Sequence, residues 1–542
     1  MSVLDSWSIE IQFSAGVWSD VTDDVIVADT VRCDTGFIDN GPTDRVARTG
    51  NLTFSLDNST NNSAGLAGYY SPGHGNVRAG FEVGIPVRLC VSFEGVTKTK
   101  FYGRIAKDGI TPDTGPYDKR RTRVVAVDYM NQLSTHELFL PAYTTNKRMD
   151  EIMPLITGNM PRAPLSTSYD TGVETFTSVF DTVTSKTSAL SEVQKLALSE
   201  WGYCYISHSS DYDEILRFEN QNARDEASYA VIPESVDESG YLLMENGDYL
   251  LQENGDKLIL DVSRPTDFFI DSSIGAKVSY GKHLANQITV TSYPRAYDAS
   301  ATVLYSLPSA ISLAAGTIRT LVANFTDPNN KAVQVAGKTM ESPAATTDYL
   351  MNSSAEGTAT NLTANLSVSV TYGANAGSYA LENTGTTDGY ITKLQARGIG
   401  IYLYDPIEYV AVGTASQADL GLHTLDVEMT YQDNPTQAER IGGFLAADAL
   451  SPTYEMESYP FYANKNGRHM MAFVFLEIGQ KIQIIETQSG FNKDIFIDGI
   501  SFEIHPNSIV KCTYKTRFAS SLAGWQLGID GKSELGETTV LG

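Results

Sequence analysis

The sequence is short of basic residues and of cysteine. Its 542 residues include 39 Lys and Arg against 65 Asp and Glu, a formal net charge of −26. Nucleic-acid binding and docking on anionic lipid both need clustered Lys and Arg, so we expect neither specific nucleic-acid binding nor direct lipid binding. The four cysteines have spacings that match no zinc motif, and they are too few for a disulfide scaffold. They therefore predict reduced thiols.

Long apolar runs are missing as well. No run of about 18 apolar residues is present, as a membrane-spanning helix would need. Residues 1–13 have neither the basic nor the apolar part of a secretory signal, so none is expected. These absences predict a protein that is made and assembled in a cytoplasm. At roughly 150 residues per domain, the length predicts three to four domains.

No catalytic, metal-binding or cofactor-binding pattern stands out. A permissive phosphate-loop pattern ends in Gly337-Lys338-Thr339, but the residues before it prefer strand and Pro343 follows where a helix should grow. His136-Glu137 begins like a zinc-protease motif, yet Leu140 stands where the second His is needed. We therefore expect no catalytic residue, no metal and no cofactor, and a role that is not enzymatic.

What the sequence does have is short strands separated by turn residues. Residues 7–13, 51–57, 86–92 and 122–128 alternate apolar and polar side chains, which predicts strands with one face on a core. Helical spacing is confined to residues 187–201 and 435–450 and a shorter stretch over 147–158. The fold class is therefore mainly β with some α (α+β), in several domains built from antiparallel barrels or sandwiches.

Changes in composition divide the chain into six parts. Residues 241–260 contain a tandem repeat, YLLMENGD followed by YLLQENGD, whose Asn-Gly pairs favour type I′ turns and predict a three-stranded meander. The turn positions are Asn246, Gly247, Asn254 and Gly255. The predicted parts are a β domain over 1–130, an α+β domain over 131–265, returning strands over 266–292, an inserted β-rich module over 293–390, a second β domain over 391–520 and a C-terminal arm over 521–542.

Residues 49–134 contain an ordered series of motifs. The series consists of a strand ending in Leu-Asp-Asn, a loop with Ser-Pro, a Gly-x-Pro-Val-Arg strand, a Phe-x-Gly-x-Ile strand and a strand ending in Asp. The positions that carry it are Leu56, Asp57, Asn58, Ser71, Pro72, Gly84, Pro86, Gly103 and Asp128. This series resembles the N-terminal domain of minor tail proteins of long-tailed bacteriophages. Later segments also look like tail-protein pieces, so the resemblance covers most of the chain except parts of 293–390.

The resemblance implies a tail hub or baseplate protein that continues and closes the tail tube at its tip. In such hubs each chain carries two tube-like β-barrel domains, and three chains imitate a six-fold ring. It implies a homo-oligomer, with a trimer favoured and a hexamer possible, located in the virion at the tail tip. The implied partners are the tail tube or distal tail protein, the tape-measure protein and tail fibre or receptor-binding proteins, while DNA passes through without specific binding.

Three alternatives stay open at this point. The chain could be the distal tail ring protein, which would be a hexamer with one tube-like domain. The module at 293–390 could bind host carbohydrate. The chain could also be a tail-associated hydrolase. The excess of acidic residues has two interpretations. They could line the inside of the tail tube and repel the phosphates of the passing DNA, or they could serve solubility alone.

Overall fold

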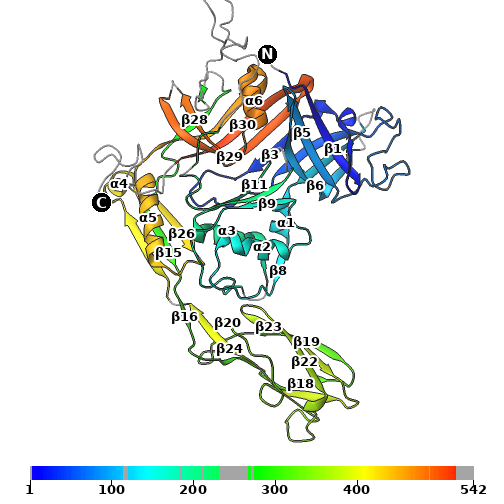
Figure 1. Cartoon of the computed structure of the whole chain (residues 1–542), viewed down its shortest axis with the longest axis vertical. Coiled ribbons are helices and arrows are strands. Elements are labelled where there is room, and N and C mark those ends of the chain that lie inside the picture. Colours follow the sequence, from blue (N-terminus) through cyan, green and yellow to red (C-terminus); the bar gives the residue numbers. More distant parts are fainter. Residues whose placement is uncertain are drawn as a thin grey trace, which may run out of the picture.

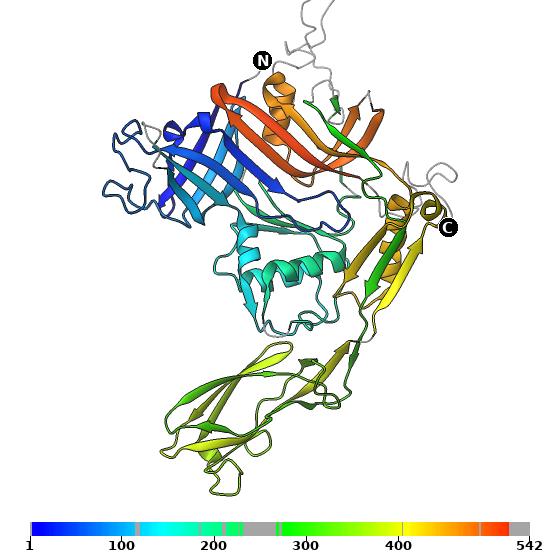
Figure 2. The same ribbon diagram turned by 180° about the vertical axis from the view of Figure 1, so that it is seen from behind.

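The molecule consists of a broad β-sheet, an α+β domain packed beside it, a small sheet covered by a helix, and a long β module that extends away from the rest (Figures 1 and 2). The computed structural model describes residues 3–113, 120–183, 186–208, 213–225, 227–230, 267–269, 274–403, 405–486 and 489–519. The predicted meander and its four turn positions, and the predicted C-terminal arm, lie outside the described residues.

The broad sheet has 13 strands and draws on both ends of the chain. Its N-terminal strands are β1 (Ser6–Ser14), β2 (Val17–Asp20), β3 (Val31–Gly36), β4 (Asn51–Asp57), β5 (Pro86–Phe93), β6 (Val96–Asp113) and β7 (Arg121–Val127). Its other strands are β13 (Asp267–Phe269), β14 (Lys277–Tyr280), β27 (Tyr454–Tyr462), β28 (Lys481–Glu486), β29 (Phe491–His505) and β30 (Ile509–Phe518). The order is β14-β27-β30-β29-β3-β4-β7-β6-β5-β1-β2; in addition, β28 pairs with the first part of β29, and β13 pairs with β28.

One face of this sheet forms the largest apolar core. The predicted strand over 51–57 forms as β4: Leu52, Phe54 and Leu56 are buried and Asn51, Thr53 and Asp57 are partly exposed, while Ser55 on the opposite face is buried as well. Helix α6 (Gly467–Phe475) lies against the same core, and the Asn466 side chain caps it by accepting the His469 N–H at 2.9 Å. Periodicity did not single out this helix, because its apolar residues run almost without interruption.

The α+β domain packs under the sheet (Figure 1). Its helices are α1 (Tyr129–Thr135), α2 (Met149–Gly158) and α3 (Ala189–Glu200), and its strands are β8 (Glu137–Phe139), β9 (Ser166–Tyr169), β10 (Lys186–Ser188), β11 (Tyr203–Ser207) and β12 (Ile215–Glu219). The helix predicted over 187–201 forms as α3. The Ser188 hydroxyl caps it by accepting the Ser191 N–H at 3.1 Å.

Glu200 at the end of α3 is a buried carboxyl group. Its two oxygens accept the backbone N–H groups of Val173 at 2.7 Å and Glu174 at 3.0 Å. Burial is the main reason that the pKa of Glu200 is raised to about 8, and the charges of Glu174 and Asp150 raise it further. The group is therefore protonated in the folded chain over a pH range in which it is ionised in the unfolded chain.

We expect the free energy of unfolding to fall as the pH rises from about 5 to about 8, by at most about 1.4 kcal/mol per pH unit from this group. The sign follows because folded Glu200 keeps a proton up to a pKa of about 8, whereas the unfolded group releases it near 4.5. Glu200→Gln should flatten this slope in urea unfolding curves, and Glu137→Gln, at an exposed position, should not. Equal slopes for the two variants would contradict the assignment.

A three-stranded sheet covered by a helix lies beside the sheet and the α+β domain (Figure 2). It contains β15 (Gln287–Ser292), β25 (Ile407–Val412), β26 (Thr424–Met429), α4 (Thr414–Leu420) and α5 (Pro435–Ala449). The helix predicted over 435–450 forms as α5, with Pro435 in its first turn and the Asn434 side chain accepting the Thr436 N–H at 3.1 Å. Its buried side chains, including Ile441 and Leu445, face Ile288 and Val290 of β15.

The extended module is built on one long strand. Its strands are β16 (Arg295–Tyr297), β17 (Thr302–Ser306), β18 (Ile311–Leu313), β19 (Ile318–Asn324), β20 (Ala336–Lys338), β21 (Tyr349–Asn352), β22 (Leu366–Tyr372), β23 (Ala376–Asn383) and β24 (Gly389–Leu403). Five of them pair with β24, and β19, β23 and β22 form a second sheet. The boundary predicted at residue 390 falls inside β24. Gly337 and Lys338 lie in β20, so this is a strand and not a phosphate loop.

The module is fixed to the α+β domain at two places. At one, Arg295 forms a buried ion pair with Asp181 at 2.9 Å. At the other, the turn between β22 and β23 enters the α+β core: the Ala374 N–H donates to the Pro141 carbonyl at 2.9 Å, and Asn375 Nδ2 donates to the Asp181 carbonyl at 2.6 Å. The module is thus held in one orientation and does not hang on a single linker.

Five 3-10 turns complete the described elements: η1 (Thr22–Asp24), η2 (Val27–Asp29), η4 (Thr363–Asn365), η5 (Ala463–Lys465) and η6 (Pro506–Ser508). All four cysteines are buried and free, as the sequence predicted: Cys33, Cys90, Cys204 and Cys512. Within the described part of the chain, no helix is both long and apolar enough to cross a membrane.

Candidate assembly site: the seam between the two β domains

The two β domains predicted at the ends of the chain are joined through a pair of strands. β3 of the N-terminal domain runs antiparallel to β29 of the C-terminal domain, in register from Val31 opposite Ile504 to Gly36 opposite Gly499. We call this strand pair, with the side chains on its two faces, the seam. The domains are therefore two halves of one open sheet and not two separate barrels, and no pairing among the described strands closes the sheet on itself.

A β-bulge at Asp498 shapes the inner face of the seam. Opposite β30, Ile497 pairs with Thr516 and Gly499 pairs with Lys515, so Asp498 is an extra residue in its strand. A bulge of this kind turns a side chain away from its regular alternation. Asp498, with 1% of its surface exposed, accepts Arg224 Nη1 at 2.8 Å and Arg517 Nε at 2.5 Å.

This buried carboxylate links three parts of the molecule. Arg517 belongs to β30, and its Nη2 also donates to the Asp44 carbonyl of the N-terminal domain at 2.8 Å. Arg224 comes from the α+β domain and also pairs with Glu219 at 3.1 Å. The guanidinium of Arg224 lies 3.5 Å from the centre of the Tyr203 ring. Because buried charges are stable only when they are paired, this network fixes the α+β domain against both halves of the sheet.

Close backbone contact completes the inner side of the seam. Gly36 has a φ of +100°, and a Cβ atom there would lie 2.3 Å from the Asp498 carbonyl oxygen. The next residue, Phe37, donates its N–H to that same oxygen at 3.0 Å. Only glycine fits this position, since the conformation and the space both exclude a side chain.

The same face of the seam, farther along from the bulge, carries partly exposed ion pairs. Arg32 contacts Glu503 across the strands at 3.2 Å. Asp34 accepts the Ser501 hydroxyl at 2.7 Å and pairs with Arg48 and with Lys515. Pairs this exposed contribute about 0–1 kcal/mol each, so they set register more than they add stability. This surface carries charges of both signs and is not uniformly acidic.

A second buried ion pair joins strand β6 to the segment that follows helix α6. Lys100 of β6 pairs with Glu477, which follows α6, at 2.7 Å. Burial opposes ionisation of Glu477, but Lys100 and His208 outweigh it and hold its pKa below the usual value. This contact ties the N-terminal half of the sheet to the helix that covers the C-terminal half.

The residues that carried the sequence resemblance lie within the N-terminal β domain, and of them Asp128 comes near the seam strand β3 at Thr35. Leu56 is buried in the core, and Asp57 accepts the Ser59 N–H at 2.8 Å. Asn58 organises the following loop: it accepts the Tyr70 N–H at 2.8 Å and donates to the Ser71 hydroxyl at 2.6 Å. Pro72 lies exposed in the same loop.

The remaining motif positions lie in a turn, in two strands and at the start of a helix. Gly84 has a φ of +82°, and Pro86 pairs with Arg104 at the start of β5. A Cβ atom at Gly103 would lie 2.4 Å from the Val127 carbonyl oxygen. Asp128 caps α1 by accepting the Met130 N–H at 3.0 Å, and burial raises its pKa well above the usual value. These positions are structural, and the seam residues were not predicted.

No protein-family model matches the sequence, and no curated protein matches it. Among solved structures, the chain is similar to a tail protein from Neisseria meningitidis, with 7% identity, a TM-score of 0.43 and coverage of 94% of this chain and 96% of that one. It is similar to the 43 kDa tail protein of prophage MuSo2 from Shewanella oneidensis, with 9% identity, a TM-score of 0.43 and coverage of 95% and 100%. It is also similar to the prophage tail protein gp18 from Listeria monocytogenes, with 10% identity, a TM-score of 0.37 and 94% of each chain covered.

Proposed function

We propose that this chain is a structural hub protein of a bacteriophage tail tip. The observation that carries the proposal is the seam, because one chain supplies two β domains side by side in a single sheet. A chain with two such domains can occupy two neighbouring places in a ring. Three copies would then present six β domains to a six-fold tail tube. In this role the chain closes the tube, contacts the tape-measure and fibre proteins and lets DNA pass.

The two ends of the sheet path support joining between copies. Within the described strands, β2 pairs only with β1, and β14 pairs only with β27. A strand edge with unpaired N–H and C=O groups is a template for pairing with another chain. We propose that β2 of one copy joins β14 of the next, which extends the sheet around the ring.

The first test is the mass of the purified full-length chain by light scattering behind a sizing column. A trimer is expected. A hexamer would favour the distal tail ring instead, and a chain that stays monomeric at every accessible concentration would contradict a self-closing hub.

A second test uses charge on the sheet edge. Val17 in β2 is 58% exposed, so Val17→Lys should leave the monomer folded and shift the mass distribution toward monomer, since Lys on an edge strand disfavours pairing. The matched control is Val333→Lys, because Val333 is 45% exposed in the extended module. Equal masses for the two variants would exclude the β2 edge as the contact.

The extended module suggests a second candidate function, host-carbohydrate binding. The observation in its favour is that the module reaches away from the sheet while being held firmly at its base (Figure 1). A variant in which residues 298–402 are replaced by a short Gly-Ser turn should keep the oligomer mass and lose binding to host cells. Unchanged cell binding would exclude this function.

A further inference from the structure

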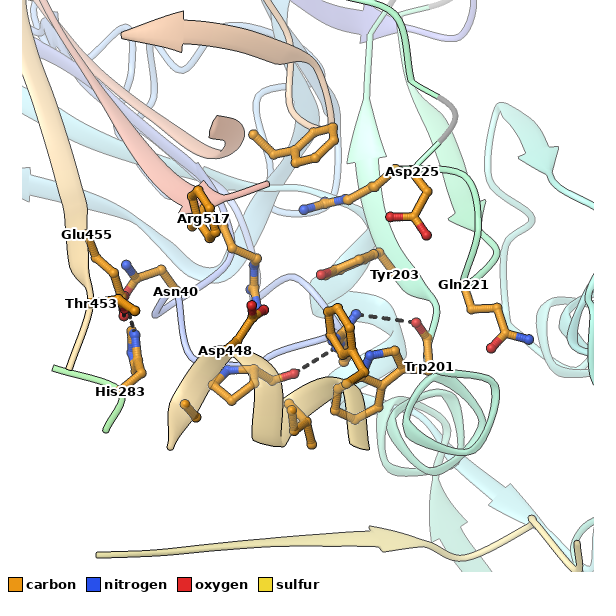
Figure 3. A pocket seen from close by; sticks show the side chains of 18 residues that line it. Asn40, Trp201, Tyr203, Gln221, Asp225, His283, Asp448, Thr453, Glu455 and Arg517 are labelled. Atoms are coloured by element: carbon orange, nitrogen blue, oxygen red, sulfur yellow. Dashed lines mark hydrogen bonds and ion pairs between the residues drawn. The ribbon is translucent and has the colours of Figure 1, made fainter. Parts of the chain in front are cut away.

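The junction of the sheet, the α+β domain and α5 contains a small pocket, shown in Figure 3. Its walls come from several separated segments, among them those of Arg45, Trp201, Arg224, Asp448 and Arg517. Its volume of about 110 Å³ equals the share of three to four water molecules in the liquid, at about 30 Å³ each. The pocket is therefore too small for a nucleotide and large enough for a group of about five heavy atoms.

Among the residues that the structure describes, two buried donors that line this pocket have no hydrogen-bond partner. Trp201 is 1% exposed and Arg224 is 7% exposed, and Trp201 Nε1 and Arg224 Nη2 are buried without a hydrogen bond. A buried donor left unpaired costs about 1–3 kcal/mol, so native proteins rarely leave one without a partner. Two such donors on one pocket indicate an occupant that supplies acceptor oxygens.

Three arginines and three carboxylates line the pocket, and Arg45 is the arginine that the described residues leave without a carboxylate partner. Arg45 is buried, lies 3.8 Å from the centre of the Trp201 ring, and donates to the backbone carbonyls of Pro42 at 2.7 Å and Trp201 at 3.3 Å. Among the described residues it has no ion pair with a carboxylate, whereas Arg224 and Arg517 share Asp498. Burial, and then the charges of Arg517 and Arg224, lower the pKa of Arg45 to about 10.

Three carboxylates also line the pocket, and none of them bonds the two unpaired donors. Glu455 contacts His283 at 2.5 Å. Asp225 and Asp448 each interact with other parts of the chain. Figure 3 shows Asp448 on the helix side and Tyr203 in the centre, with its hydroxyl directed toward Arg517. The side of the pocket formed by Arg45, Trp201 and Arg224 thus keeps its excess of donors.

We infer that this pocket binds one small oxyanion, a phosphate, sulfate or simple carboxylate group, between Arg45, Trp201 and Arg224. The anion accepts the Nε1–H of Trp201 and the Nη2–H of Arg224 and balances the charge of Arg45. Because these residues come from the N-terminal β domain and the α+β domain, the bound anion joins the two. This inference does not rest on the proposed tail function.

The test is calorimetric titration of the full-length chain with phosphate, sulfate and acetate, each at constant ionic strength set by chloride. We expect saturable binding at one site per chain. Trp201→Phe should weaken it about tenfold or more, the usual loss for one hydrogen bond to a charged group. The folded state should persist, since the deleted donor is unpaired without ligand. A preference for phosphate and sulfate over acetate would identify a tetrahedral anion, and the reverse a carboxylate.

The matched control is Trp18→Phe, because Trp18 packs on Tyr102 outside the pocket. It should bind the anion like the unaltered chain. Arg45→Gln, which removes the unbalanced charge, should abolish binding. The inference is overturned by the absence of saturable heat up to about 10 mM of every anion, which is weaker than a Kd of about 1 mM, or by equal affinities in Trp201→Phe and Trp18→Phe.

Discussion

Gly36→Ala is expected to lower the free energy of unfolding by about 3 kcal/mol or more and to weaken the seam selectively. About 1–2 kcal/mol of this comes from placing a side chain at a positive φ. A further 1–3 kcal/mol, roughly, comes from forcing apart backbones that are already in contact, because the new Cβ atom would lie 2.3 Å from the Asp498 oxygen. The clash is with backbone, so no side-chain rotation relieves it.

The control for this variant is Gly16→Ala. Gly16 also has a positive φ, +76°, but a Cβ atom there meets nothing within 4 Å. Urea unfolding should separate the two variants, and hydrogen exchange should show faster exchange of β3 and β29 amides in Gly36→Ala alone. If both variants lost the same free energy of unfolding, the close backbone contact at the seam would not contribute to stability.

Asp498→Asn is expected to cost about 3–5 kcal/mol, the usual loss when one partner of a buried ion pair is removed. The substitution keeps the shape of the side chain but leaves Arg224 and Arg517 without their shared charge. Since Arg224 belongs to the α+β domain, we expect that domain to loosen against the sheet. Limited proteolysis should therefore cut between them sooner than in the unaltered chain.

The matched control removes a carboxylate whose ion pair is exposed. Glu137 pairs with Lys186 at 2.9 Å, with more than half of each side chain exposed. Glu137→Gln should change stability by less than about 1 kcal/mol. If Asp498→Asn were equally mild, the buried network could not be what fixes the three parts together.

Local structure was largely predictable from the sequence, because it depends on local patterns. The alternation in 51–57 predicted β4, and the helical spacing over 187–201 and 435–450 predicted α3 and α5. The missed helix α6 has apolar residues on nearly every side, which removes the 3.6-residue signal. The run FVFLEIG around its end favours a strand by composition, and contacts with the core decide otherwise.

The seam was not predictable in the same way, since it pairs residues more than 450 positions apart. The one usable signal was Asp498-Gly499 inside an otherwise regular strand, because an interior glycine often marks a bulge or the approach of another backbone. Nothing local says that the approaching backbone is Gly36. The predicted second β domain over 391–520 was also too simple: β24 up to Leu403 belongs to the extended module, and β25, β26 and α5 form a unit of their own.

The double attachment of the extended module has a mechanical consequence. Its turn at Ala374 and Asn375 enters the α+β core, while Arg295 holds its base to the same domain. Both contacts reach Asp181, so a pull on the far end of the module acts as a torque on the α+β domain about the region of this residue and is not taken up by a flexible linker. The α+β domain that receives this torque is bonded through Arg224 to Asp498, so a load applied outside would reach the middle of the shared sheet.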